Sequence, residues 1–431
     1  MRGVTRVRSV LRNQALLTLM FGHFSNDLLA GFLTVFLPVA RDRFDLSNGQ
    51  AGLIALAYAS ASSLSQPFFG WAADRRFRGW LPPAVLIWGG LCTAAYGLAP
   101  SYAVLIGCAA AAGIASGAYH PLGASAASAV TDLGTRNTAM SLYTVGGTSG
   151  FALGPVVGVM ALWGFGARGS VVFFPLALLA ATAMVRQMPR VTARLTARAA
   201  DAEAASYATP GRTVADGAAT PWPVLARVVG VVMLRSWIFL SVLQFLPIWY
   251  DDLGYGGEFY GPLVSTVILA GAAGTLTGGY LADRIGGRTV LLVSLLGSLP
   301  FLILISAVPG PLVFVAGAAF GLTADSSLAV TLVAAQRLLP GRTGVASGII
   351  LGLGFVTGGI GVPVTGRIAD AVGIPVALAL LTPFGLAAAA LALTIPAAVL
   401  STKQDHRSGA PEGVDEANGA SAIPRVALPS E

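Results

Sequence analysis

Apolar runs long enough to cross a lipid bilayer recur along nearly the whole chain. A helix needs roughly 20 residues to span about 30 Å of hydrocarbon. We place twelve such runs at residues 15–39, 49–73, 81–99, 102–127, 137–163, 169–187, 222–250, 258–282, 289–307, 311–336, 343–366 and 374–400. The runs are continuous rather than alternating, and only helices or closed barrels satisfy their backbone in lipid. The sequence therefore predicts an all-α membrane protein with twelve transmembrane helices.

Composition supports this class. Of the 431 residues, 55% are hydrophobic and only 10% are charged, whereas roughly a quarter of a soluble domain is charged. A cleaved signal peptide is the alternative interpretation of the arginine-rich start. The first run is too long for one, contains polar residues and lacks a small-residue cleavage pattern. Cys92 and Cys108 lie inside the third and fourth runs without a CxxC spacing, which favours small apolar core residues.

The basic residues predict the orientation, because the cytoplasmic loops of helical membrane proteins retain Lys and Arg. With the N-terminus inside, the opposite side keeps only Arg41, Arg43, Arg168 and Arg367. We therefore expect a multi-pass protein of the bacterial inner membrane with both termini in the cytoplasm. The net charge of +7 then reflects this topology. Nucleic-acid binding is disfavoured, because no basic patch has interleaved aromatic residues.

The chain divides into two halves of six runs each. Residues 188–221 are rich in Ala, Thr and Arg, too polar to span and without an apolar face, which indicates a cytoplasmic linker. The predicted domains are a cytoplasmic tail 1–14, a bundle 15–187, the linker 188–221, a bundle 222–400 and a disordered tail 401–431. The halves also repeat in sequence: GWAADRRFRG follows the second run and GGYLADRIGGR follows the eighth. Parallel repeats of six spans build many secondary transporters.

These motifs carry a resemblance to a known family. The loop GGYLADRIGGR resembles the hallmark of the major facilitator superfamily, and Gly146 to Gly158 are similar to a fifth-span motif of its drug antiporters. The stretches HFSNDLLAGFL, SSLSQPFFGWAAD, AYHPLGASAA and AQRLLPGRTGVASGIILGLGFVTGGIG resemble the fosmidomycin-resistance family of efflux transporters. This resemblance covers both halves without the tails and the linker. It implies the two-bundle major facilitator fold, in which spans 1, 4, 7 and 10 line a central cavity.

Asp27 is the first candidate functional residue, because it lies midway along an apolar run. His23 comes four residues earlier on the same helix face, and Asn26 is adjacent in sequence. A carboxylate at the bilayer centre costs roughly 2.5 to 3.5 kcal/mol on insertion scales, so such a group is functional by default. We expect a proton or substrate site around Asp27. The alternative is a polar contact that only fixes helix packing.

Further candidates lie in the other three spans that the resemblance assigns to the cavity. Arg235 is near the centre of the seventh span and Asp325 near the centre of the tenth. With Asp27 they make two carboxylates and one guanidinium at similar depth, which suggests an ion pair that a proton or substrate can break. We expect protonation of Asp27, alone or together with Asp325, to weaken the pairing to Arg235. His120 precedes a proline in the fourth span, and Tyr119 and Gln66 are possible hydrogen-bonding groups. For each of them ordinary packing is the alternative, and for Arg235 it is snorkelling to the interface.

The sequence departs from the family just after His120. The family has an acidic and a basic residue where this chain has Leu122 and Ser125. Substrate or proton chemistry that depends on those two family residues therefore does not carry over to this chain.

Two further groups have mechanical interpretations. We expect the repeated loop to form gate latches across the seam between the halves, through Gly70, Asp74, Arg75, Gly279, Asp283, Arg284 and Arg288. A helix-packing motif is formed by Gly146, Gly150, Gly154, Pro155 and Gly158. Small residues let helices approach closely, and this face could hold the halves together on the outer side. Solvated loop charges and ordinary packing are the respective alternatives.

An ion gradient is the expected energy source. The one lysine, Lys403, does not follow a glycine-rich loop, so a P-loop is absent, and neither GxGD nor HExxH occurs. We therefore expect no enzyme, cofactor or metal site. The predicted function is proton-coupled efflux of a small drug-like or anionic compound by a monomer in the bilayer. A proton-coupled importer of a small metabolite is the alternative, and a receptor without transport is a weaker one.

Overall fold

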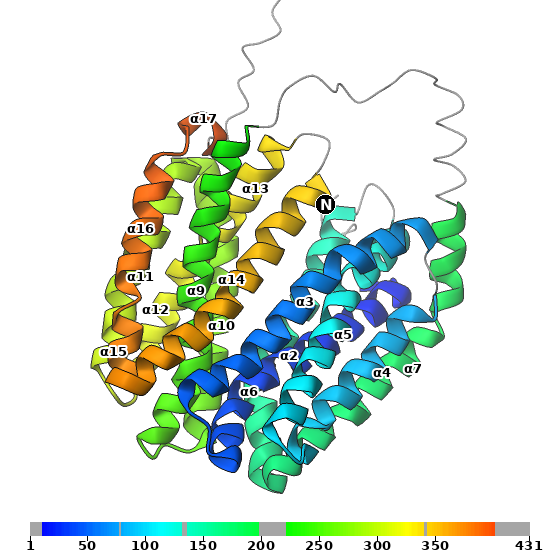
Figure 1. Cartoon of the computed structure of the whole chain (residues 1–431). Helices are drawn as coiled ribbons and strands as arrows, with labels where there is room; N and C mark the ends of the chain where they lie inside the picture. Colours follow the sequence, from blue (N-terminus) through cyan, green and yellow to red (C-terminus); the bar gives the residue numbers. More distant parts are fainter. Residues whose placement is uncertain (1–10, 77–78, 132–135, 198–220, 340–342, 401–431) are drawn as a thin grey trace, which may run out of the picture.

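The computed structural model describes residues 11–76, 79–131, 136–197, 221–339 and 343–400. The N-terminal half contains α2 (Gln14–Phe44), α3 (Asn48–Arg76), α4 (Leu81–Ala94), η1 (Tyr96–Leu98), α5 (Tyr102–Ala129), α6 (Arg136–Phe165), η3 (Gly166–Val172) and α7 (Phe173–Val185). The C-terminal half contains α9 (Trp222–Asp252), α10 (Gly257–Ile285), α11 (Gly287–Ala307), α12 (Val313–Asp325), α13 (Leu328–Leu338), α14 (Thr343–Val372), α15 (Ile374–Ala379), α16 (Thr382–Leu393) and α17 (Ala397–Leu400). Figure 1 shows the two halves side by side.

Helices occupy all twelve predicted spans. Within the described residues, ten helical stretches are long and apolar enough to cross a membrane, and one of them, residues 139–185, covers the fifth and sixth predicted spans together. The second span, α3, is not among the ten, because Ser, Gln and Gly residues lower its hydropathy. Its 29 residues are nevertheless long enough to cross a bilayer. The all-α fold of two six-helix bundles is confirmed.

Local sequence signals set several helix ends. The Asn13 side chain accepts the backbone N–H of Leu16 at 3.2 Å and so caps the start of α2. Asp45 ends the same helix in the left-handed conformation, with φ 50°. Ser101 caps α5 in the same way as Asn13 caps α2. These short polar segments separate long apolar helices, as a membrane protein requires.

The two halves are packed together at one end only. One hydrophobic core joins residues of both halves, including Phe32, Ala51, Val159, Ile238 and Val362. Two further cores lie nearer the opposite end, and each belongs to a single half. We call the joined end the Arg41 end, because Arg41 closes it. The described residues therefore form an assembly that is closed at the Arg41 end, with a separate core in each half at the other end.

The start of the linker differs from the prediction. Residues 188–197 are helical, with Met188 and Val191 buried and Leu195 packed against the core of the N-terminal half. This segment was predicted to have no apolar face. Apolar residues at positions 188, 191 and 195 do place one face of a helix against the bundle. The rest of the linker and both predicted tails lie largely outside the described residues.

Candidate functional site

The structure brings three predicted site residues together in the N-terminal half. His23 and Asp27, one turn apart on α2, approach to 3.3 Å between the imidazole Nε2 and the carboxylate Oδ2. The Nε2 atom of His120, from α5, lies 3.7 Å from the other carboxylate oxygen. Asn26 donates its amide to that same oxygen at 2.8 Å. The Asp27 carboxylate is therefore surrounded by two imidazoles and an amide in a largely buried position.

The neighbours of His23 fix its ring. Its Nδ1 atom lies 2.9 Å from the backbone carbonyl of Tyr143, and its ring stacks on the Tyr143 ring with the centroids 4.3 Å apart. Gly147 makes room for this arrangement, since an added Cβ would lie 2.5 Å from both Asp27 Oδ2 and His23 Nε2. The backbone of α6 therefore sits directly against the His23 and Asp27 side chains.

Two weaker candidates are less directly connected to this cluster. Tyr119 is fully buried and donates its hydroxyl to the carbonyl of Leu19 at 3.2 Å, and its ring lies 6.1 Å from the His23 ring between centroids. A role for Tyr119 as a hydrogen-bonding group of the cavity stays a prediction. Gln66 is partly exposed on α3, and it has no hydrogen-bond partner among the described residues. A role for Gln66 stays a prediction.

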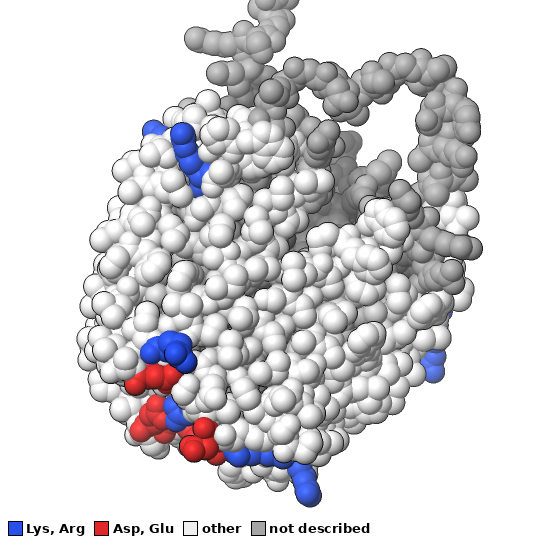
Figure 2. Space-filling view, viewed as in Figure 1, with Lys and Arg blue, Asp and Glu red and all other residues white. Residues whose placement is uncertain are grey.

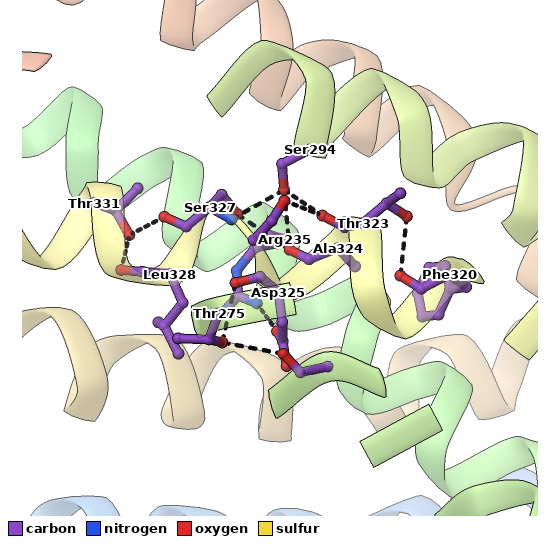
Figure 3. A network of polar contacts seen from close by, with 12 residues as sticks. Arg235, Thr275, Ser294, Phe320, Thr323, Ala324, Asp325, Ser327, Leu328 and Thr331 are labelled. Carbon is purple, nitrogen blue, oxygen red and sulfur yellow. Dashed lines mark hydrogen bonds and ion pairs between the residues drawn. The ribbon is translucent and has the colours of Figure 1, made fainter. Parts of the chain in front are cut away.

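Of the two carboxylates expected near Arg235, the structure pairs it with Asp325 and not with Asp27. Arg235 of α9 is hydrogen-bonded through Nη1 to Asp325 Oδ1, with only 10% and 16% of the two side chains exposed (Figure 3). The Nε atom of Arg235 is buried and has no partner among the described residues. Arg235 therefore pairs with Asp325 of its own half, while Asp27 is surrounded by histidines in the other half.

A break in the tenth span positions Asp325. The helix stops at Asp325 and resumes at Leu328, and Ser294 of α11 fills the gap in hydrogen bonding. Its hydroxyl donates to Thr323 O at 2.6 Å and accepts the N–H of Ser327 at 3.2 Å (Figure 3). Thr275 of α10 donates to the carbonyl of Asp325 at 3.2 Å. Hydroxyls from two neighbouring helices thus hold the interrupted backbone in place, as buried polar groups require.

The glycines of the motif pack α6 against α2. A Cβ on Gly150 would meet the backbone of Phe24, and one on Gly154 would lie 2.7 Å from the Cα of Gly31. Gly146 and Gly158 likewise face Met20 and Phe32 of α2. The predicted helix packing is present. Pro155 of the motif also lies against the other half, where its carbonyl oxygen would be 3.2 Å from a Cβ on Gly261. A role of the motif in holding the halves together stays a prediction.

The sequence analysis missed the polar latches of the Arg41 end. Arg41 of α2 makes two hydrogen bonds to Asp252 of α9, one of them 3.0 Å long. Asp370 of α14 accepts the backbone N–H groups of Asn48 and Gly49, at 2.7 and 3.1 Å, and so caps α3 from the other half. Figure 2 shows acidic and basic side chains gathered together towards one end of a mostly uncharged face, with further basic residues near the opposite end. The sequence did contain a signal for these latches, because Arg41 and Arg367 lie on the side of the membrane that is predicted to have few arginines.

The predicted gate at the opposite end is only partly described. Gly70 and Gly279 are helical, whereas the side chains of Asp74 and Arg75 lie outside the described residues. Asp283 is exposed, and the part of the chain that is described offers it no ion-pair partner. Arg284 lies over the ring of Tyr280, 4.4 Å from its centroid. A latch across the seam by these residues therefore stays a prediction.

Arg288 has a role that differs from the predicted latch. It donates to the carbonyls of Leu393 and Ile395, at 3.0 and 2.5 Å. These carbonyls belong to the end of α16 in the same half, so Arg288 caps that helix and does not reach across the seam.

A comparison with known families decides the class of this protein. The model described as Major Facilitator Superfamily matches residues 19–274 and 252–425. The chain belongs to the major facilitator superfamily. It is therefore a multi-pass membrane transporter for small molecules, in a class of proteins that are not enzymes. The resemblance stated from its motifs is confirmed.

Individual relatives in the superfamily agree. The chain is 31% identical over 373 residues to an uncharacterized MFS-type transporter, YfnC, of Bacillus subtilis, covering 85% of this chain and 90% of that protein. It is 29% identical over 360 residues to the fosmidomycin resistance protein of Escherichia coli, covering 81% and 84%. A solved bacterial homologue of the human lysosomal transporter Spinster, in an inward-facing and unoccupied conformation, has a TM-score of 0.73 at 16% identity. It covers 90% of this chain and 98% of that structure, which shows the shared facilitator fold.

Removal of one latch should open the Arg41 end of this facilitator. Asp370→Ala deletes the acceptor of two N–H groups at the start of α3, and loss of such a cap costs about 0.5 to 2 kcal/mol. The open state should become roughly two- to thirtyfold more populated. The readout is the labelling rate of Ala59→Cys, which lies on the seam beside Gly359, by a hydrophilic maleimide after Cys92 and Cys108 are replaced by alanine.

Glu258→Ala is the matched control for Asp370→Ala. Glu258 is an exposed acid in the first turn of α10, near the same end of the molecule. Its removal should leave the labelling rate of the Ala59→Cys protein unchanged. Equal rates in the Asp370→Ala and Glu258→Ala proteins would contradict the latch.

Proposed function

We propose that the chain is a proton-coupled exporter of a small drug-like or anionic compound, working as a monomer by alternating access. The Escherichia coli relative is named for resistance to fosmidomycin, and export of a compound is one way in which a transporter confers resistance. We place the protein in the bacterial inner membrane with both termini in the cytoplasm, since most basic residues outside the spans fall on that side.

The buried pair of Arg235 and Asp325 carries this proposal. An intramembrane ion pair is a functional site by default, because charges in hydrocarbon are costly. Arg235 stays protonated under all physiological conditions, so only Asp325 can change its charge. A proton on Asp325 neutralises the carboxylate and releases the guanidinium. The C-terminal half thus has two states that differ by one proton, which is the element a gradient-driven transporter needs.

Arg235 has N–H groups that Asp325 does not use, and an acidic compound can bind to them. While Asp325 holds Nη1, the buried Nε remains without a partner among the described residues. An acidic group of the compound can bind to a guanidinium that Asp325 keeps oriented. If the compound binds only the state in which Asp325 holds the guanidinium in place, compound and proton select different states of the pair and exclude each other. Such exclusion is the condition for exchange of a compound against protons.

The same pair also admits the importer. If the acidic group of a compound displaces Asp325 from Arg235, the freed carboxylate is left in an apolar surrounding and binds a proton. Compound and proton then bind together, which is the condition for symport. The two functions therefore differ in the sign of one measurable quantity, the number of protons released on binding.

The test is proton release on addition of fosmidomycin, and then of other small anions, to the detergent-purified protein in weakly buffered solution. We expect release of up to one proton per protein in the wild type and none in Asp325→Asn. Proton uptake would support the importer instead. Release that persists in Asp325→Asn would contradict the assignment of the exchanged proton to this pair.

A further inference from the structure

The cluster of His23, Asp27 and His120 has a feature that proton exchange at Asp325 leaves unexplained. The ligand-type atoms of these three residues all lie within 4.8 Å of one another. They come from two helices, His23 and Asp27 from α2 and His120 from α5. We propose that these three side chains form a binding site for one divalent transition-metal ion, such as Zn²⁺ or Co²⁺. The site lies in the half that does not contain Arg235.

The donor set favours such ions. Two imidazole nitrogens and one carboxylate oxygen suit Zn²⁺, Co²⁺, Fe²⁺ and Mn²⁺, whereas Ca²⁺ and Mg²⁺ prefer oxygen ligands alone. Three protein ligands leave a further coordination position to water or to a bound compound. The His120 side chain is 36% exposed, so this side of the cluster can be reached from outside the packed helices.

The distances fit a metal after a small adjustment. Bonds of about 2.0 to 2.2 Å in a tetrahedral site separate neighbouring ligand atoms by roughly 3.3 to 3.5 Å. Asp27 lies 3.3 Å from His23 and 3.7 Å from His120 between the nearest nitrogen and oxygen atoms. The two contacts use different oxygens of the carboxylate, and the three ligand atoms lie within 4.8 Å of one another, so His120 has to move closer to complete the set. Its partly exposed side chain has the freedom to do so.

The surroundings of His23 orient the ring for a metal. A carbonyl oxygen can only accept a hydrogen bond, so the Nδ1 atom of His23, 2.9 Å from Tyr143 O, carries a hydrogen. In the neutral ring the lone pair of Nε2 then points towards the Asp27 carboxylate. These two atoms, 3.3 Å apart, need a positively charged partner, and either a proton or a metal ion can supply it. Ring nitrogens that bind metals usually show this second contact to a carbonyl or carboxylate.

The carboxylate is held in a similar way. Asn26 donates to Asp27 Oδ1 and also lies 3.5 Å from the Ser116 hydroxyl, which ties the acid to both α2 and α5. Gly147 leaves the space that the ligand atoms need, because a Cβ there would lie 2.5 Å from both His23 Nε2 and Asp27 Oδ2. No metal site is expected from the sequence, in which His120 lies 93 positions after Asp27. Folding of α5 against α2 creates the set.

The experiment is titration of the full chain with Co²⁺ and Zn²⁺ in detergent, after removal of any polyhistidine tag. The chain has three histidines, His23, His120 and His406. We expect one bound ion per protein, with visible Co²⁺ absorption bands typical of nitrogen ligation. His23→Gln and His120→Gln should each weaken binding more than about 100-fold, because loss of an outer-shell partner alone costs about 10- to 100-fold. His406→Gln is the matched control and should bind as the wild type does.

A second variant separates ligand geometry from ligand chemistry. Gly147→Ala removes no polar atom but displaces the His23 and Asp27 side chains, so it should also weaken Co²⁺ binding and change the absorption bands. The proposal is overturned if the wild type binds no Co²⁺ or Zn²⁺ at about 100 μM. It is equally overturned if His23→Gln and His120→Gln bind as tightly as His406→Gln. Proton release at Asp325 is measured without added metal, so the two proposals fail independently.

Discussion

Arg235→Leu is expected to abolish transport and to lower the stability of the folded protein by about 3 to 5 kcal/mol. The substitution leaves the buried Asp325 carboxylate without its ion-pair partner, and breaking a buried pair from one side has this cost. Stability is measured by thermal denaturation in detergent, and transport by uptake of compound into inverted vesicles under a proton gradient. Arg190→Leu is the control, because Arg190 is exposed and bonds only to Gln187 among the described residues.

The double variant Arg235→Leu with Asp325→Leu distinguishes folding from function. Replacement of both members of a buried pair by apolar residues is often neutral or stabilising. We therefore expect the double variant to regain most of the lost stability while transport stays absent. A double variant that transports at the wild-type rate would remove this pair from the mechanism. A single variant as stable as the wild type would show that Asp325 finds another partner.

Gly150→Leu is expected to destabilise the N-terminal half by about 3 kcal/mol or more and to lower the yield of monodisperse protein. A Cβ at this position would lie 2.8 Å from the carbonyl carbon of Phe24 and 2.9 Å from its Cα, so the obstacle is backbone. Overpacking of a core usually costs about 1 to 3 kcal/mol, and a backbone obstacle cannot move aside as a side chain can. Size-exclusion chromatography after graded heating measures the effect.

Gly107→Leu is the matched control for this variant. Gly107 is a glycine of α5 with nothing within 4 Å of an added Cβ, so the same substitution should change the melting temperature little. If Gly150→Leu cannot be purified, Gly150→Ala should show the smaller cost of about 1 to 3 kcal/mol. Equal melting temperatures for Gly150→Leu and Gly107→Leu would contradict close packing between α6 and α2.

The helices were predictable because the membrane imposes them. A run of roughly 20 apolar residues has few alternatives in lipid, so most of the spans follow from hydropathy, while the more polar α3 is recognised by its length. The break between Asp325 and Leu328 was not predictable in the same way. No proline marks it, and the backbone is satisfied by the hydroxyl of Ser294 from another helix. A stop of this kind depends on tertiary contacts, which hydropathy does not report.

The candidate site was partly predictable for a similar reason. His23 and Asp27 share a face because they are four residues apart on one helix. The partners of Asp27 and Arg235 depended on which helices of each half pack together, and spacing along the chain does not encode this. The latches between Arg41 and Asp252, 211 positions apart, show the same limit. The glycine motif predicted close packing correctly, but it could not identify α2 as the partner.

The Arg41 latch and the central ion pair differ in their contact with the surrounding solution. The Asp252 side chain is 42% exposed, whereas Arg235 and Asp325 are 10% and 16% exposed. Dissolved ions screen exposed charges over about 8 Å at 0.15 M and leave buried pairs largely unaffected. The salinity of the medium at that end therefore tunes how readily the two halves part, without altering the affinity of the centre.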